Sequence, residues 1–139
     1  MLFYRRPAVG IYLIYVHKMH MKPAVLKHLT AIPTEITHQG TTHQKRLVTS
    51  EEKHKGTIAT MNYAWLEPGM QLAAHTHPDG EEFYLFLEGT GQILVGDTWV
   101  PVDTGSFVTI PAGDAHSVKN SGKTILTFIT VRTVIEPGP

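Results

Sequence analysis

Two histidines separated by one residue, His75 and His77, are the side chains whose type and spacing most clearly suggest chemistry. Successive residues of a β-strand point to opposite sides, so within a strand both imidazoles lie on one face, about 6–7 Å apart. Two imidazoles placed in this way can hold one metal ion. A carboxylate from across the next turn and a fourth ligand from another strand would complete the site. Imidazole together with carboxylate suits Mn, Fe, Ni, Cu or Zn.

The elements that must position these side chains are short strands. From residue 57 onward, apolar or alternating runs recur between turns rich in glycine and proline, a pattern that predicts an all-β sandwich or barrel. Gly96-Asp97 lies between two such runs and predicts a hairpin, because glycine reaches positive φ without strain. The predicted strands cover residues 57–66, 71–77, 82–87, 92–95, 98–102, 107–110, 116–118 and 124–134.

Two spaced patterns run through these strands. Residues 69–89 read G-x5-H-x-H-x4-E-x6-G, and residues 105–120 read G-x5-P-x-G-x2-H-x3-N. Ten specified positions at roughly 5% usage each coincide by chance about once in 10¹³ placements. In both patterns the sequence resembles the cupin superfamily, and it departs from the two cupin motifs at none of the ten positions. The ten residues are Gly69, His75, His77, Glu82, Gly89, Gly105, Pro111, Gly113, His116 and Asn120.

The resemblance implies a double-stranded β-helix (jelly-roll) barrel that holds a divalent transition metal at its mouth. The implied ligands are His75, His77, Glu82 and His116. The implied ion is Mn, Fe, Ni, Cu or Zn, because these ligands serve several metals equally well. The motif glycines are expected to allow tight reversals between strands. Asn120 is expected to hold a turn through bonds from its side chain to the backbone.

The carboxylate ligand has one alternative, because Glu81 also fits the looser form of the motif. We choose Glu82, which keeps the six-residue step to Gly89. On a strand, Glu82 also shares its face with Tyr84 and Phe86. Both aromatic side chains are therefore candidates for the wall of a pocket beside the metal.

Composition excludes several classes of protein. The chain has 139 residues and no cysteine, which excludes disulfides, thiolate metal sites and cysteine nucleophiles. No apolar stretch approaches the length of a membrane span. The net charge is zero, but residues 1–55 carry a balance of +6 and residues 56–139 a balance of −6. An acidic barrel is a poor partner for a phosphate backbone, so we expect neither nucleic acid nor a membrane as partner.

The sequence divides into three parts. Residues 1–20 are expected to be an N-terminal extension, residues 21–56 an arm with short strands, and residues 57–139 the cupin barrel. Within the arm, residues 25–36 are expected to supply one or two strands and residues 40–55 a loop. Residues 17–54 carry six histidines whose spacings match no metal site, so we expect these side chains to be solvated. They are His17, His20, His28, His38, His43 and His54.

The first twenty residues resemble a secretory signal weakly. Arg5 and Arg6 precede an apolar run over residues 8–16, but no small-residue cleavage site follows. We therefore favour an extension, or a start assigned too far upstream, over an export signal, and expect a cytoplasmic protein. Met1, Met19 and Met21 are the alternatives for the true start.

The predicted strand over residues 82–87 is apolar on both faces. One face carries Tyr84 and Phe86, and the other carries Phe83, Leu85 and Leu87. A strand on the surface of a lone barrel should alternate apolar and polar residues, so the outer face must be covered by the other sheet, the arm or a second subunit. We favour a homodimer.

Two classes of function fit this sequence. The first is a metal-dependent enzyme acting on a small organic substrate, with dioxygenase as the leading reaction class and isomerase or decarboxylase chemistry as alternatives. The second is a non-catalytic barrel that binds or senses a small metabolite, since a fold does not settle a function. We favour the enzyme, although beyond the implied ligands the sequence singles out no acid–base residue.

Overall fold

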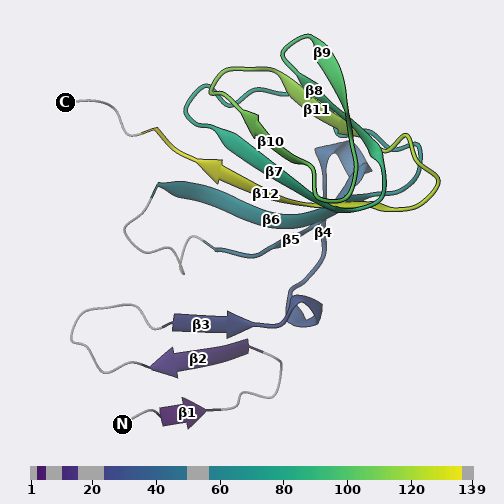
Figure 1. Ribbon diagram of the computed structural model, residues 1–139. Helices are drawn as coiled ribbons and strands as arrows, with labels where there is room; N and C mark the ends of the chain where they lie inside the picture. The colour runs from purple at the N-terminus through teal and green to yellow at the C-terminus, as the bar shows by residue number, and fades with distance from the viewer. Residues whose placement is uncertain (1–2, 6–10, 16–23, 50–56, 136–139) are drawn as a thin grey trace.

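The computed structural model describes residues 3–5, 11–15, 24–49 and 57–135, and the side chains from residue 27 onward within these ranges. The described residues are almost entirely β-strand and turn, with two single-turn 3-10 helices in the arm, η1 (Leu29–Ala31) and η2 (His38–Gly40) (Figure 1). The strands are β1 (Phe3–Arg5), β2 (Ile11–Tyr15), β3 (Ala24–Lys27), β4 (Glu35–Thr37), β5 (Thr42–Arg46), β6 (Ile58–Leu66), β7 (Glu82–Glu88), β8 (Gly91–Val95), β9 (Thr98–Val102), β10 (Phe107–Ile110), β11 (His116–Lys119) and β12 (Leu126–Thr133).

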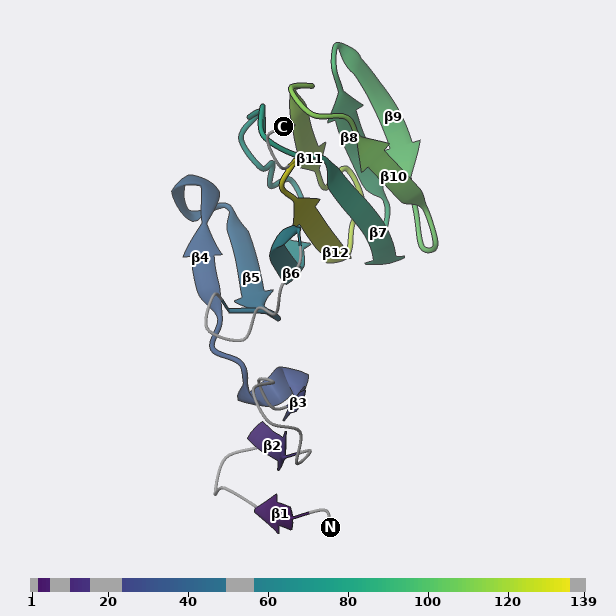
Figure 2. The ribbon, with the colours of Figure 1, turned by 90° about the vertical axis from the view of Figure 1, so that its left-hand side faces the viewer.

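Two sheets form the barrel. The larger has the strand order β10-β7-β12-β6-β5-β4, and the smaller has the order β11-β8-β9. The sheets lie face to face in Figure 2, and the buried apolar side chains between them come from both. The sequence expectation of an all-β jelly roll is confirmed. The core cluster consists of Ala64, Leu66, Leu72, Tyr84, Phe86, Ile93, Val102, Ile110, Val118, Leu126 and Phe128.

Most strands of the barrel lie where the sequence places them. The Gly96-Asp97 hairpin is confirmed, because Val95 pairs with Thr98 across it and Gly96 has φ +64. Two expectations are wrong. Residues 71–77 form only isolated bridges instead of a strand. Residues 42–46 form β5 instead of a loop, and β5 pairs with β6 inside the larger sheet. β5 reads THQKR, and a polar strand of this kind gives no hydrophobic alternation from which it could be recognised.

Asn120 holds the turn before β12, as the sequence predicts. Its side-chain amide donates to the carbonyls of Leu66 (2.9 Å) and Thr124 (2.8 Å), and its Oδ1 accepts from the backbone N–H of Gly122 (2.9 Å). The side chain is buried, so these three bonds replace water for groups that have no access to it. The residue that closes the second motif therefore ties the end of β6 to the loop between β11 and β12.

The first three strands form a separate sheet in the order β1-β2-β3, below the barrel in both views (Figures 1 and 2). Lys27, at the end of β3, donates a hydrogen bond from its Nζ to the carbonyl of Leu47, which directly follows β5. Much of the predicted extension over residues 1–20 lies outside the described residues, as do Met1, Met19 and Met21. In the described part of the chain there is no helix of the length and hydropathy that a membrane span requires.

Candidate metal centre

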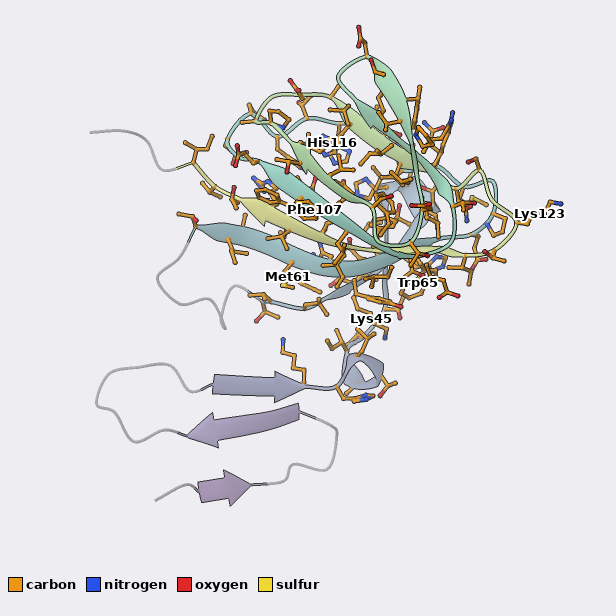
Figure 3. All side chains as sticks on the ribbon, in the orientation of Figure 1. Lys45, Met61, Trp65, Phe107, His116 and Lys123 are labelled. Atoms are coloured by element: carbon orange, nitrogen blue, oxygen red, sulfur yellow. The ribbon has the colours of Figure 1, made fainter. Side chains whose placement is uncertain are left out.

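The four side chains predicted as ligands lie together inside the barrel. One ligand atom from each of His75, His77, Glu82 and His116 lies within 4.8 Å of the others. Glu82 and His116 are the first residues of β7 and β11, and the two other histidines come from the segment before β7. His116 lies between the sheets (Figure 3). Glu81, the alternative carboxylate, is exposed and contributes its backbone carbonyl to a bond with Thr133.

The segment carrying His75 and His77 is less regular than a strand. It pairs with β11 at two isolated bridges, Gln71 with Lys119 and His75 with His116. From one bridge to the other the chain advances four residues in this segment, from Gln71 to His75, but only three in β11, from Lys119 to His116. The segment therefore contains one extra residue, as a β-bulge does. A regular pairing from Gln71 would place Ala115 opposite His75. The extra residue instead makes His75 the direct partner of His116.

Backbone carbonyls orient two of the imidazoles. The Nδ1 of His75 lies 2.9 Å from the carbonyl of Ala73, and the Nδ1 of His116 lies 3.1 Å from the carbonyl of Asp114. A carbonyl can only accept a hydrogen bond, so Nδ1 carries a proton and Nε2 is the nitrogen left for a metal, although in His116 Nε2 shares a proton with Oε2 of Glu82. Fixing the tautomer in this way is the usual support for a metal-bound histidine.

Glu82 is the electrostatic centre of the cluster. Its Oε2 lies 2.8 Å from Nε2 of His116 and 3.3 Å from Nε2 of His77. Burial is the largest single influence and raises the pKa of Glu82, but the bond from His116 and the three neighbouring imidazoles together bring it below the ordinary value. In His116 burial has the opposite sign and lowers the pKa. The bonds of His116 to Glu82 and Asp114 outweigh that effect, so its pKa lies above the ordinary value.

These observations show that the residues fit a divalent metal. A buried carboxylate faces three imidazoles, and a proton shared with His116 balances its charge. A metal ion that takes the carboxylate and neutral imidazoles as ligands displaces such a proton. Three nitrogen donors and one oxygen donor suit the mid-row transition metals.

The two aromatic pocket candidates take different positions. Tyr84 borders the cavity next to the cluster and donates its hydroxyl to Oε2 of Glu82 at 3.2 Å. Burial and then the charge of Glu82 raise the pKa of Tyr84 well above 10, so the phenol keeps its proton. Phe86 is completely buried in the core behind Tyr84, and Phe128 from β12 borders the cavity instead.

His38 belongs to the site although its sequence context predicts a solvated side chain. It lies in η2, and its ring centroid is 5.1 Å from that of His75. Burial and then the neighbouring His75 lower the pKa of His38, which favours the neutral imidazole. His38 and Gln39 have φ of +50° and +61°, in the left-handed region that costs a non-glycine residue about 1 kcal/mol or more. Only the pairing of residues 35–46 with the barrel brings His38 here, and no local spacing signals it.

A cavity of about 210 Å³ lies beside the cluster, and His75, His77 and Glu82 form part of its wall. Its other lining residues come mainly from the inner face of the larger sheet, and most of them are polar. They are Thr37, His38, Thr42, Gln44, Arg46, Thr60, Asn62, Ala64, Leu72, Tyr84, Phe128, Thr130 and Arg132. This volume is below the roughly 300–1,000 Å³ of pockets for drug-sized ligands. The cavity therefore suits a small and polar molecule.

Comparison with known proteins agrees with the fold. The family model described as the cupin domain matches residues 63–132, half of the chain. The protein belongs to the cupin family. Among solved structures, this cupin resembles a predicted oxalate decarboxylase from Thermotoga maritima, with a TM-score of 0.73 and 25% identity over 78% of this chain and 97% of the other. It also resembles the polyketide cyclase RemF from Streptomyces resistomycificus in fold, with a TM-score of 0.66 and 20% identity over 80% of each chain.

Two curated relatives carry names that point to ligands. This cupin is 33% identical over 66 residues to the oxalate-binding protein of Thermotoga maritima, covering 48% of this chain and 54% of that protein. It is 30% identical to auxin-binding protein 1 of Arabidopsis thaliana, covering 48% of this chain and 39% of that protein. The chain thus spans about half the length of the curated relatives it matches, or less.

Proposed function

We propose that this cupin binds a divalent transition metal on His75, His77, Glu82 and His116 and uses it to hold a small, oxygen-rich organic anion. The observation that carries the proposal is the position of the four-residue cluster, which opens directly into a small polar cavity. When bound, the ion supplies Lewis-acid polarisation of ligand oxygens and open positions for chelation.

The charges around the cavity favour an anion. Arg46 and Arg132 both line it, and the carboxylates that pair with them, Glu35 and Asp79, are not among its lining residues. Glu82 is the one carboxylate in the lining, and a metal ion bound to it would balance its negative charge. Similarity to a protein named for binding oxalate supports an oxygen-rich anion as the ligand.

The test is metal analysis of protein purified without chelator, together with a His75→Ala/His116→Ala double variant. We expect near-stoichiometric Mn, Fe, Ni, Cu or Zn in the wild type and none in the variant. Oxalate should then raise the melting temperature of the metal-loaded wild type alone, because a ligand that binds only the folded protein stabilises it. Wild-type protein that holds no metal, and takes none up on titration, would refute the proposal.

Dioxygenase chemistry is a second candidate, favoured by the number of protein ligands. Four ligands on an octahedral ion leave two positions open, enough for an organic substrate and O₂ together. Oxygen uptake by the iron-, nickel- or copper-loaded protein with diketones, catechols or flavonols would support it. Ligand-dependent stabilisation without turnover would instead favour a non-catalytic, metabolite-binding cupin, and turnover without oxygen uptake would favour isomerase or decarboxylase chemistry.

A further inference from the structure

Three polar atoms on the wall of the metal cavity have no hydrogen-bond partner. Among the described residues, the buried side-chain atoms without a partner are Oγ1 of Thr42, Oδ1 of Asn62, Nε of Arg132 and Nδ1 of His43. The first three belong to residues that line the cavity, and Thr42 is only 1% exposed. A buried polar atom left unpaired costs about 1–3 kcal/mol. Such a cost gathered around one cavity indicates a binding surface.

The three residues, called here the polar wall, offer two donors for a carboxylate and one acceptor for a hydroxyl. The hydroxyl of Thr42 and the Nε–H of Arg132 can both donate. Arg132 is held in place by Asp79, whose two carboxylate oxygens accept from its Nη2 at 2.8 and 2.9 Å, which leaves Nε directed elsewhere. Asn62 donates from Nδ2 to Thr130 at 3.5 Å, so the other end of its amide stays free for a ligand.

The sheet register sets how far part of the polar wall lies from the metal ligands. Glu82 on β7 lies opposite Arg132 on β12, whereas Asn62 lies on β6, one strand further and opposite Thr130. Strands in a sheet are about 4.8 Å apart, so the backbones that carry Glu82 and Asn62 are separated by roughly 10 Å. An acid chelated by the metal through one end therefore needs additional length to reach Asn62.

We propose that the polar wall is a second recognition site within the metal cavity, which binds the distal carboxylate or hydroxyl of a dicarboxylic or hydroxydicarboxylic acid longer than oxalate. The inference rests on the proposed metal function, because the metal holds the proximal carboxylate. Within the polar wall, Thr42 on β5 lies far along the sheet from Glu82 and receives the distal carboxylate, whereas Arg132 lies opposite Glu82 and contacts the carboxylate that the metal holds. The free Oδ1 of Asn62 accepts a hydrogen bond from a hydroxyl of the acid.

Calorimetric titration tests this inference on the full chain loaded with the ion found by metal analysis. The probes are oxalate, malonate, succinate and malate, added singly to the wild type and to the variants Thr42→Val and Asn62→Leu. Both substitutions keep the approximate volume and remove the polar atom. Thr109→Val, an exposed strand threonine on β10, is the matched control.

We expect succinate or malate to bind the wild type more tightly than oxalate does. Thr42→Val should weaken succinate and malate, and Asn62→Leu should weaken malate, each on the order of tenfold, while both leave oxalate unchanged. The melting temperature of Thr42→Val should not fall, since Oγ1 has no hydrogen bond to lose. Equal affinity for acids of every length, or equal weakening of oxalate and the longer acids by the wall variants, would overturn the inference and leave the metal function standing. Failure of every acid, oxalate included, to bind would refute the proposed function and the inference with it.

Discussion

Oε2 of Glu82 lies 2.8 Å from Nε2 of His116, so a carboxylate at the start of β7 directly contacts an imidazole at the start of β11. The contact joins the two sheets at the position where a metal ion needs both ligands. Glu81, which precedes Glu82 in the sequence, is exposed and is not a member of this cluster. Adjacent carboxylates in the same strand-start region therefore have different roles, and they can be separated by substitution.

Glu82→Gln should abolish stable metal binding, while Glu81→Gln should leave it intact. The glutamine amide lacks the negative charge that balances the cation. We therefore expect the loss in metal affinity to exceed the roughly 10–100-fold that is typical when a residue bonded to a ligand, rather than the ligand itself, is changed. Competition titration with a chelating dye measures both variants. A larger loss in Glu81→Gln than in Glu82→Gln would contradict the assignment of the ligand.

Asn120→Ala should destabilise the barrel by about 3 kcal/mol, because it removes one buried and two part-buried hydrogen bonds and leaves the carbonyl of Leu66 without its donor. Chemical denaturation, followed by tryptophan fluorescence, measures the change. The adjacent exposed residue supplies the control, since Ser121→Ala removes no hydrogen bond of this turn. Similar stabilities for the two variants would show that the Asn120 bonds contribute little.

Gly89→Ala should cost about 3 kcal/mol or more, whereas Gly96→Ala should cost about 1 kcal/mol. Both glycines have positive φ, at +86° and +64°. A Cβ at Gly89 would lie 2.4 Å from the carbonyl oxygen of Ile125, while a Cβ at Gly96 would meet nothing within 4 Å. The difference between the two therefore isolates the close approach from the backbone strain. Equal losses of stability would mean that the loop of Ile125 yields without cost.

The outer face of the larger sheet should be the interface of a homodimer. Leu85, Leu87 and Phe107 are exposed by 38%, 37% and 62%, and Phe107 pairs with Leu85 across adjacent strands. The outward-facing residues of β7, β12 and β6 carry no charge; Phe83 and Trp65 are examples. This face therefore matches a second copy of itself better than it matches a charged partner.

Light scattering behind a sizing column tests the dimer. We expect twice the chain mass for the wild type and a single-chain mass for a Leu85→Glu/Phe107→Glu double variant. Val100→Glu introduces one such charge at a comparably exposed residue of β9 in the other sheet, and it should leave the dimer intact. A wild type of single-chain mass would refute the homodimer.

The sequence predicted the barrel well because its evidence is local. Turn residues, alternation and the two spaced motifs each act within a few residues, and they located the strands from β6 to β12 and the buried turn of Asn120. β5 was missed because Thr42 and Gln44 face a polar cavity, so the strand lacks the apolar alternation that burial against a core produces. His38 and the polar wall were missed for a related reason. Their role depends on the pairing of β5 with β6, which brings together residues far apart in the chain.

The pairing of His75 with His116 has a practical consequence. Each backbone N–H of the pair donates to the carbonyl of the other, at 3.1 and 3.0 Å, and the next backbone bond from this segment to β11 runs from Leu72 to Val118. An ion bound by both imidazoles would clamp this bridge shut, and its removal would let the bridge open more often. Amide hydrogen exchange at these two positions should therefore report metal occupancy directly, before any substrate is known.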